Sequence, residues 1–241
     1  DGNGNLTIID SSTAGLADNV TLTIVSTDLV VTDPDNVLVS SVGTQVSDHE
    51  VRVPLATITN QKVVTNHGPG KDQLNAAGVT STLSLEAAGG PGDDTLTGGS
   101  LDDTLDGGLG DDDLDGGSGT DVLTISQDGH LTITTTQTFG QGTDTFANIE
   151  QASLEGGSRN NRLDASLATI PVTLLGLGGS DTLLGGSAAD VLDGGAGIDF
   201  AEVFGSNIVL TDASAPGAGA ETLIALEGLQ LVASVPGSSI D

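Results

Sequence analysis

The amino-acid sequence predicts an all-β protein, a right-handed parallel β-roll or β-helix that forms a solenoid. Short runs rich in Val, Ile, Leu and Thr alternate between apolar and polar residues, and turns containing Gly, Asp and Pro separate them. Nine-residue units also repeat in tandem, which is the sequence signature of a solenoid. No stretch has the 3.6-residue periodicity of an amphipathic helix.

The first segment, residues 1–88, is predicted to be an N-terminal β region. β-branched residues dominate it, and Asp-Pro and Gly-Pro sequences interrupt it. Strands are expected over residues 20–24, 37–39, 51–55 and 61–65, with turns over 33–36 and 66–70. These strands favour coils of a parallel β-helix that continue into the tandem repeats. A separate small β-sandwich is the alternative.

Four nine-residue units follow one another without a gap, and each fits the pattern G-G-x-G-x-D-x-U-x, where U is a large apolar residue. They are residues 89–97, 98–106, 107–115 and 116–124. Glycine allows the sharp turn of the first six residues, because it adopts positive φ angles at little steric cost. The last three residues form a short strand with one inward side chain. Two units then make one coil, so residues 18 apart stack, and Leu96 is expected over Leu114.

This pattern resembles the calcium-binding nonapeptide of the RTX (repeats-in-toxin) family. The resemblance implies a parallel β-roll in which Ca²⁺ binds to the turns. Calcium accepts six to eight oxygen ligands in flexible geometry, and the turns offer Asp carboxylates and backbone carbonyls. The candidate ligands at position six are Asp94, Asp103, Asp112 and Asp121. The acids at position five either assist or are solvated surface charge; they are Asp93, Asp102 and Asp111.

A second, less regular array covers residues 176–202. Its three units keep an acid at position six, and these acids are Asp181, Asp190 and Asp199. Leu101 in the first array and Ala188 in the second stand where glycine is expected at position four, so their turns are expected to form less readily.

Two outlying units, residues 67–75 and 156–164, resemble the repeat more loosely. Asp72 is a further candidate calcium ligand in the first of them, and Asn161 replaces the acid in the second. Because a lysine or arginine lies inside each turn, both units are expected to serve more as structural coils than as metal sites.

A longer repeat lies over the nonapeptides. Residues 142–150 align with 219–227, and 130–134 with 207–211, both at an offset of 77. We therefore expect three segments: 1–88, 89–157 (the first array and longer strands) and 158–241 (the second array and longer strands). We also expect the chain to be cut from a longer, repetitive protein, because its C-terminus falls where the next module would start. The initial Asp and the lack of a signal segment are expected of a mature or excised piece.

The charge balance excludes several partners. Five basic residues stand against 34 acidic ones, giving a formal charge of −29, which argues against binding to nucleic acid or anionic membranes. No apolar run reaches transmembrane length, so no membrane insertion is expected. There is no cysteine for a disulfide. His49, His67 and His130 lie outside known metal-enzyme motifs, and neither a G-x-S-x-G elbow nor a phosphate loop is present, so the chain is not expected to be an enzyme.

The leading functional hypothesis is a calcium-binding structural module of a secreted or cell-surface protein, such as an adhesin, surface-layer or filament component, that folds in extracellular calcium. Its partners are calcium ions and, through the open ends of the solenoid, copies of itself or neighbouring modules. The alternative is the calcium-dependent RTX region of a secreted hydrolase or toxin whose catalytic part lies outside this chain. A third hypothesis is an ice- or glycan-binding strand array, for which Thr132, Thr134 and Thr136 form one short run.

Overall fold

The computed structural model describes residues 5–9, 17–34, 44–47, 50–203, 209–211 and 222–225. Within these residues the chain forms 24 strands and one short 3-10 helix, Leu55–Thr57, and no α-helix. The prediction of an all-β fold with parallel strands is therefore confirmed. His49, Phe204 and the strand expected over residues 37–39 lie outside the described residues. No helix in the described part of the chain is long and apolar enough to cross a membrane.

The chain divides into two compact units. Unit 1 comprises residues 1–122 and 144–149, and unit 2 comprises residues 123–143 and 150–241. This division follows compactness alone. The division into three segments, which rests on the repeat pattern, stays a prediction.

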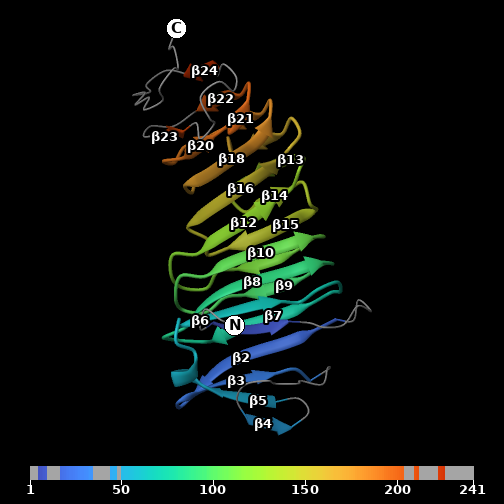
Figure 1. Ribbon diagram of the computed structural model, residues 1–241, viewed down its shortest axis with the longest axis vertical. Helices are drawn as coiled ribbons and strands as arrows, with labels where there is room; N and C mark the ends of the chain where they lie inside the picture. The colour runs from blue at the N-terminus through green and yellow to red at the C-terminus, as the bar shows by residue number, and fades with distance from the viewer. Residues whose placement is uncertain are drawn as a thin grey trace. The chain divides into compact units, whose positions relative to one another are not determined.

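Unit 1 contains two sheets (Figure 1). The first has the strand order β1-β6-β8-β10, and the second β15-β11-β9-β7-β2-β3-β5-β4. The strands are β1 Leu6–Ile9, β2 Asn19–Val25, β3 Asp28–Thr32, β4 Thr44–Ser47, β5 Glu50–Pro54, β6 Lys62–Asn66, β7 Gln73–Gly78, β8 Ser84–Pro91, β9 Thr95–Thr97, β10 Thr104–Leu109, β11 Asp113–Asp115 and β15 Thr143–Ala147.

The repeats of unit 1 set the spacing of its parallel strands. In the first array, β9 pairs with β11 and β8 with β10, and each partner lies two nonapeptides further along the chain, as expected. The coil before the array, between β7 and β9, is longer than two nonapeptides. Leu96 pairs with Leu114, so the predicted stacking is confirmed, and Leu74 and Phe146 continue the row. These side chains are at most 6% exposed, so the row lies in the core of unit 1.

The N-terminal part of unit 1 combines two kinds of pairing. β1, β6, β7 and β8 take part in parallel ladders, as expected for β-helix coils. The pairs β2–β3, β3–β5 and β4–β5 are antiparallel instead. The first of these is a tight hairpin whose two turn residues are Ser26 and Thr27, with Ser26 at φ 60°. β2, β3, β5 and β4 are therefore neighbours in that order in an antiparallel segment, which β2 joins to the parallel coils by pairing with β7.

Unit 2 has the same construction with longer insertions (Figure 1). Its sheets have the orders β12-β16-β18-β20-β23, with β21 beside β18, and β24-β22-β19-β17-β13-β14. The strands are β12 Val122–Ser126, β13 His130–Ile133, β14 Gln137–Phe139, β16 Gln151–Gly157, β17 Arg162–Asp164, β18 Val172–Gly179, β19 Thr182–Leu184, β20 Val191–Asp193, β21 Ala196–Gly197, β22 Phe200–Val203, β23 Val209–Thr211 and β24 Thr222–Ala225.

The coils of unit 2 shorten from β13 to β22. His130 of β13 lies opposite Arg162 of β17, which in turn lies opposite Thr182 of β19. Thr182 lies opposite Phe200 of β22, so the last of these coils again spans two nonapeptides. The regular spacing of the repeat therefore returns only within the second array.

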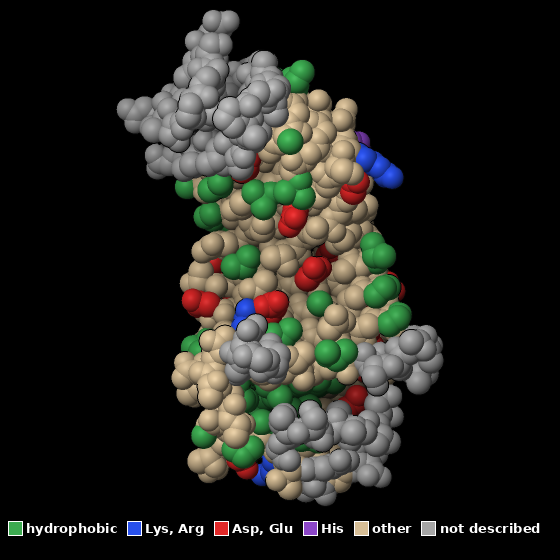
Figure 2. Space-filling model, viewed as in Figure 1, with side chains coloured by type: hydrophobic (Ala, Val, Ile, Leu, Met, Phe, Trp, Pro, Cys, Tyr) green, Lys and Arg blue, Asp and Glu red, His purple; other side chains and the backbone are tan. Residues whose placement is uncertain are grey.

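The surface carries the acidic excess of the chain, and the few basic side chains pair locally. On the face shown in Figure 2, Lys and Arg side chains are sparse among the acids. Lys62 forms an ion pair with Glu86, Arg52 with Glu50 (2.8 Å) and Arg162 with Asp164 (2.7 Å). Acidic side chains far outnumber these basic ones, so ion pairs within the chain cannot neutralise most of the carboxylates.

Candidate metal centre

The acids at position six of the repeats all lie inside the coils. Each comes two residues before the inward apolar residue of the strand, and alternate residues of an extended chain point to the same side. Each is at most 6% exposed, although Asp is one of the residues least often buried. These seven residues are Asp94, Asp103, Asp112, Asp121, Asp181, Asp190 and Asp199.

One oxygen of each buried carboxylate connects successive coils. Along one edge of unit 1, Oδ1 of Asp94 accepts the backbone N–H of Asp72 at 2.7 Å, and Oδ1 of Asp112 accepts that of Asp94 at 2.8 Å. On the other edge, Oδ1 of Asp121 accepts the N–H of Asp103 at 2.8 Å. In unit 2, Asp199 accepts from Asp181 in the same way at 2.7 Å. Each carboxylate therefore tethers the coil that precedes it.

Two further acids, not predicted from the sequence, continue the row in unit 1. Oδ1 of Asp144 accepts the N–H of Asp112 at 3.1 Å, and the N–H of Asp18 donates to Oδ1 of Asp72 at 2.7 Å. Both are buried, at 5% and 8% exposed. Asp144-Thr-Phe and Asp18-Asn-Val each keep the D-x-U spacing of the repeat. The D-x-U spacing therefore indicates both positions, but the 18-residue period of the repeat does not reach them. Asp144 lies 32 residues after Asp112, and Asp18 lies 54 residues before Asp72.

The second carboxylate oxygen has no protein partner in three of these turns. Oδ2 of Asp94, Asp112 and Asp181 is buried and accepts no hydrogen bond within the described residues. Burial raises the pKa of Asp94 and of Asp181 to about 6, against the opposing effect of the backbone hydrogen bond that each accepts. Burial likewise raises the pKa of Asp112 to about 7, helped by the neighbouring charges of Asp144 and Asp94. The ionised form of these three carboxylates is therefore unfavourable unless a cation lies beside it.

Backbone oxygens converge on the same places. A Cβ atom on Gly89 would lie 2.4 Å from Oδ2 of Asp94 and 2.6 Å from the carbonyl oxygen of Gly107, so both oxygens approach one point. Gly176 repeats this arrangement, at 2.4 Å from Oδ2 of Asp181 and 2.5 Å from the carbonyl oxygen of Gly194. The described residues contain no cluster of three or more His, Asp or Glu side chains that could hold a metal, so a cation here would depend on backbone oxygens. Such an all-oxygen set with one carboxylate per turn suits calcium, a hard cation with flexible coordination.

A comparison with protein families agrees with this geometry. The family model of the RTX calcium-binding nonapeptide repeat (four copies) matches residues 88–123 and 173–201. The two arrays are RTX repeats. RTX repeats bind calcium and form a β-roll, so the chain contains a calcium-binding repeat module. The matched family is a structural repeat and not a catalytic one. A search of curated proteins found no match.

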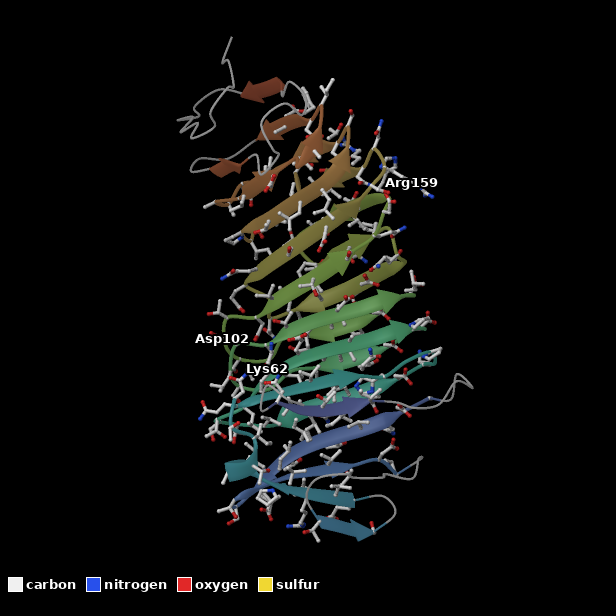
Figure 3. The ribbon with its side chains drawn as sticks, in the orientation of Figure 1. Lys62, Asp102 and Arg159 are labelled. Carbon is white, nitrogen blue, oxygen red and sulfur yellow. The ribbon has the colours of Figure 1, made fainter. Side chains whose placement is uncertain are left out.

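The position-five acids of the RTX repeats lie on the outside of the turns. Oδ1 of Asp93 accepts the N–H of Asp111 at 3.1 Å, and Oδ1 of Asp102 accepts that of Thr120 at 2.8 Å. Figure 3 labels Asp102 at the edge of unit 1, where the turns connect the strands. These carboxylates link the rims of successive turns from the solvent side. Their assistance to calcium stays a prediction.

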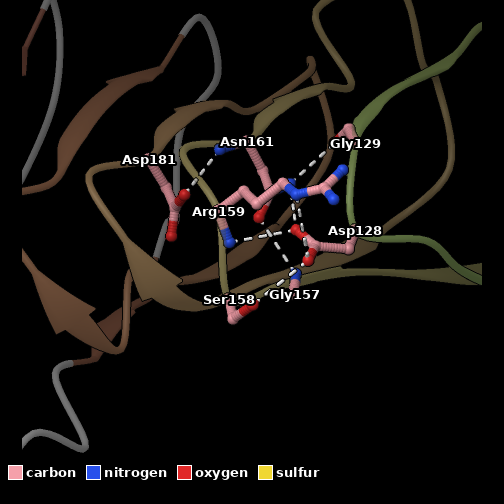
Figure 4. Close-up of polar contacts among 7 residues, drawn as sticks. All are labelled: Asp128, Gly129, Gly157, Ser158, Arg159, Asn161 and Asp181. Atoms are coloured by element: carbon pink, nitrogen blue, oxygen red, sulfur yellow. Dashed lines mark hydrogen bonds and ion pairs between the residues drawn. The ribbon is translucent and has the colours of Figure 1, made fainter.

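The turn at Asn161 has an amide in place of the carboxylate at position six, and that amide makes its hydrogen bonds within the protein (Figure 4). The Gly157 N–H donates to Oδ1 of Asn161 at 2.9 Å, and Nδ2 of Asn161 donates to the carbonyl oxygen of Gly129 at 3.0 Å. Arg159 donates its backbone N–H to Asp128 at 3.0 Å, and its side chain forms an ion pair with the same carboxylate at 3.8 Å. Desolvation acts to raise the pKa of Asp128, but hydrogen bonds from Arg159, Asn161 and Ser158 outweigh it and hold the pKa below its usual value. An amide and a guanidinium thus occupy this turn.

The remaining candidates lie as follows. Asp72 is 1% exposed, while Lys71 beside it is exposed to solvent. His67 is buried in the same turn, and its backbone N–H donates to Ala88 at 3.1 Å. Nδ1 of His130 accepts the N–H of Arg162 at 3.0 Å. The role of Asp72 as a calcium ligand stays a prediction.

Proposed function

We propose that this chain is a structural module of a secreted or cell-surface protein, an adhesin, surface-layer or filament component, which completes its fold by binding calcium outside the cell. The observation that supports it best is the set of buried Oδ2 atoms without a hydrogen bond at Asp94, Asp112 and Asp181. An ionised carboxylate that is buried and unpaired is costly, so the turn requires either a proton or a cation there.

The residues fit calcium as the cation. The carboxylates of Asp94, Asp112 and Asp181 are held at fixed positions by the hydrogen bonds to Oδ1, and the glycines beside them leave room where a side chain would collide with oxygen atoms. When bound, calcium neutralises the carboxylates and links the oxygens of neighbouring turns. The role is therefore structural, and no residue is assigned a catalytic one.

The environment of the protein sets how much calcium contributes. Extracellular calcium modules bind with Kd of about 10⁻⁴–10⁻³ M. In roughly 10 mM calcium, each such site then stabilises the fold by about 1.4–2.7 kcal/mol. The same sites stay empty at the sub-micromolar calcium of a cell interior. Repulsion in a chain of charge −29 then disfavours the compact state before export.

Calcium titration of the full chain tests this proposal. We expect far-UV circular dichroism to show a rise in β signal, and calorimetry a rise in Tm, as calcium increases from EDTA conditions to 10 mM. Magnesium at the same concentration is the control, because it demands a smaller octahedral site and gives up its water reluctantly. An unchanged β signal and Tm between EDTA and 10 mM calcium would refute the proposal.

Association through the solenoid ends belongs to the same proposal. β4 ends the second sheet of unit 1, where it pairs with β5 alone among the described strands. Strands at sheet ends offer unpaired backbone groups to another chain. Sedimentation of the chain in calcium over a range of concentrations tests this part. A monomer at the highest concentration would count against a filament.

A further inference from the structure

The RTX turns of this chain fall into two backbone classes. In the turns that lead to Asp94 and Asp112, the glycines at positions two and four have positive φ angles: +107° and +149° in the first, +100° and +136° in the second. In the turns that lead to Asp103 and Asp190, position four is Leu101 or Ala188, and none of the residues at positions two and four has a positive φ. We call the first class open turns and the second closed turns.

The closed turns place a backbone donor on the carboxylate. The Gly99 N–H donates to Oδ2 of Asp103 at 2.6 Å, and the Gly186 N–H donates to Oδ2 of Asp190 at 2.7 Å. Oδ1 of Asp103 meanwhile accepts the N–H of Leu85 at 2.7 Å. Each of these carboxylates therefore has a hydrogen bond at Oδ2 from its own turn. In the open turns of Asp94 and Asp112, Oδ2 is buried with no hydrogen bond. The turn of Asp181 belongs with them, because Leu177 and Gly179 at positions two and four have φ of +70° and +123° and Oδ2 of Asp181 is likewise buried without a hydrogen bond.

The difference follows from position four. An L-residue with a side chain rarely adopts the large positive φ angles of the open turns, so Leu101 and Ala188 direct the loop along another path. On that path the position-two N–H turns toward the acid of its own repeat. The space beside the position-one glycine does not distinguish the classes, since a Cβ on Gly98 would also lie near Oδ2 of Asp103, at 2.8 Å. The donor at position two distinguishes them, because its partial positive charge lies where a cation would need to approach.

The two closed turns also occupy equivalent places in their units. Ser100 donates its N–H to the carbonyl oxygen of Val79 at 3.1 Å, and Ser187 donates to that of Ala168 at 3.4 Å. Val79 and Ala168 each end a short turn, closed by N–H bonds of 2.8 Å to Ala76 and Ala165. Each closed turn therefore contacts a preceding coil whose turn does not have the nonapeptide pattern, and each is the first nonapeptide turn along its edge to do so.

We propose that the residue at position four decides whether an RTX turn of this chain binds calcium. Glycine gives an open, calcium-binding turn. Any other residue gives a turn that closes on its own aspartate and needs no metal. This inference rests on the proposed calcium-dependent function. Within the two arrays it assigns calcium to the turns with glycine at position four, which are those of Asp94, Asp112, Asp121, Asp181 and Asp199. Asp103 and Asp190 instead become structural caps that join the arrays to the preceding coils.

The number of calcium ions bound by the full chain tests the inference. Isothermal titration calorimetry with calcium alone gives this number for the wild type and for Asp112→Asn, Asp103→Asn and Leu101→Gly. We expect Asp112→Asn to lose at least one ion and Asp103→Asn to lose none. Leu101→Gly, which removes a side chain that is 38% exposed, is expected to gain one ion, and adding Asp103→Asn to it should abolish the gain.

The outcomes separate this inference from the proposed function. Equal losses in Asp103→Asn and Asp112→Asn, or no gain in Leu101→Gly, would overturn the role of position four while calcium binding itself stands. A wild type that binds no calcium at 10 mM would overturn both. Far-UV circular dichroism in calcium checks that each variant folds. If Asp103→Asn does not fold, the Leu101→Gly measurement alone decides.

Discussion

Replacing Asp112 by Asn should have opposite effects with and without calcium. Asn keeps an oxygen that can accept the Asp94 N–H, and it removes a buried charge. Burial, with the charges of Asp144 and Asp94, raises the pKa of Asp112 from 3.8 to about 7, which corresponds to at most about 4 kcal/mol at about 1.36 kcal/mol per unit. A buried amide without a partner costs about 1–3 kcal/mol. In EDTA at pH 8 we therefore expect Asp112→Asn to be more stable than the wild type by at most about 1–3 kcal/mol.

In calcium the same substitution removes a ligand. Each lost site forfeits about 1.4–2.7 kcal/mol at roughly 10 mM calcium. For a chain of this size 1 kcal/mol shifts Tm by about 2–4 °C, so the calcium-induced rise in Tm should shrink by about 3–11 °C. Differential scanning calorimetry in EDTA and in 10 mM calcium measures both effects. Asp113→Asn is the matched control, because it changes the charge equally at an exposed position of β11 that is no candidate ligand. A lower Tm in EDTA, or an unchanged calcium response, would refute the reasoning.

Three further predictions concern pH, the core and the turns. The raised pKa values of Asp94, Asp112 and Asp181 mean that the folded chain holds protons that the unfolded chain releases above pH 4. In EDTA, Tm should therefore fall as pH rises through 6 to 7, whereas calcium affinity should rise over the same range; a Tm that increases with pH in EDTA would contradict this. Leu114→Ala should cost about 2–5 kcal/mol in urea unfolding, because the side chain is 1% exposed between Leu96 and Phe146, while Leu109→Ala at 54% exposure should stay within about 0.5 kcal/mol. Gly110→Ala should cost at least about 2 kcal/mol, because its φ is +136° and the added Cβ would lie 1.9 Å from the Gly92 carbonyl oxygen. Gly129→Ala is the control, because the atoms nearest to its Cβ would belong to the flexible side chain of Gln127, at 3.1 Å or more; equal losses at the two glycines would refute the steric argument.

The regular part of the fold could be predicted because one period set several properties at once. Nine residues with an acid at position six and an apolar residue at position eight determine the turn, the strand, the inward face and the stacking of every second unit. The stacking of Leu96 on Leu114 follows directly from that period. Where insertions lengthen the coil, as before Asp144, the local D-x-U pattern survives but the period that would reveal it does not.

The direction of the N-terminal strands lay beyond such reasoning. Alternation of apolar and polar residues identifies a strand but does not say whether its neighbour runs parallel or antiparallel. The usual signal for a two-residue hairpin is Asn-Gly or Asp-Gly, and the hairpin between β2 and β3 uses Ser26 and Thr27 instead. With Ser26 at φ 60°, the turn geometry is imposed by the ladder on either side and not by the residues in the turn.

A sequence pattern can locate a buried polar side chain, but it does not identify the group that pairs with that side chain, and the turns of this chain show why. A carboxylate oxygen facing the interior needs a positive partner, and a proton, a cation or a backbone N–H can each supply one. Asp103 receives the N–H of Gly99, and Asn161 avoids the charge altogether by making hydrogen bonds with its amide. Oδ2 of Asp112 receives no hydrogen bond from the protein. From the sequence, Leu101 and Ala188 stand where glycine is expected at position four, and Arg159 lies inside the turn of an outlying unit. In the structure each accompanies a turn whose position-six side chain accepts a backbone N–H of that same turn, which is the arrangement that the proposed role of position four requires.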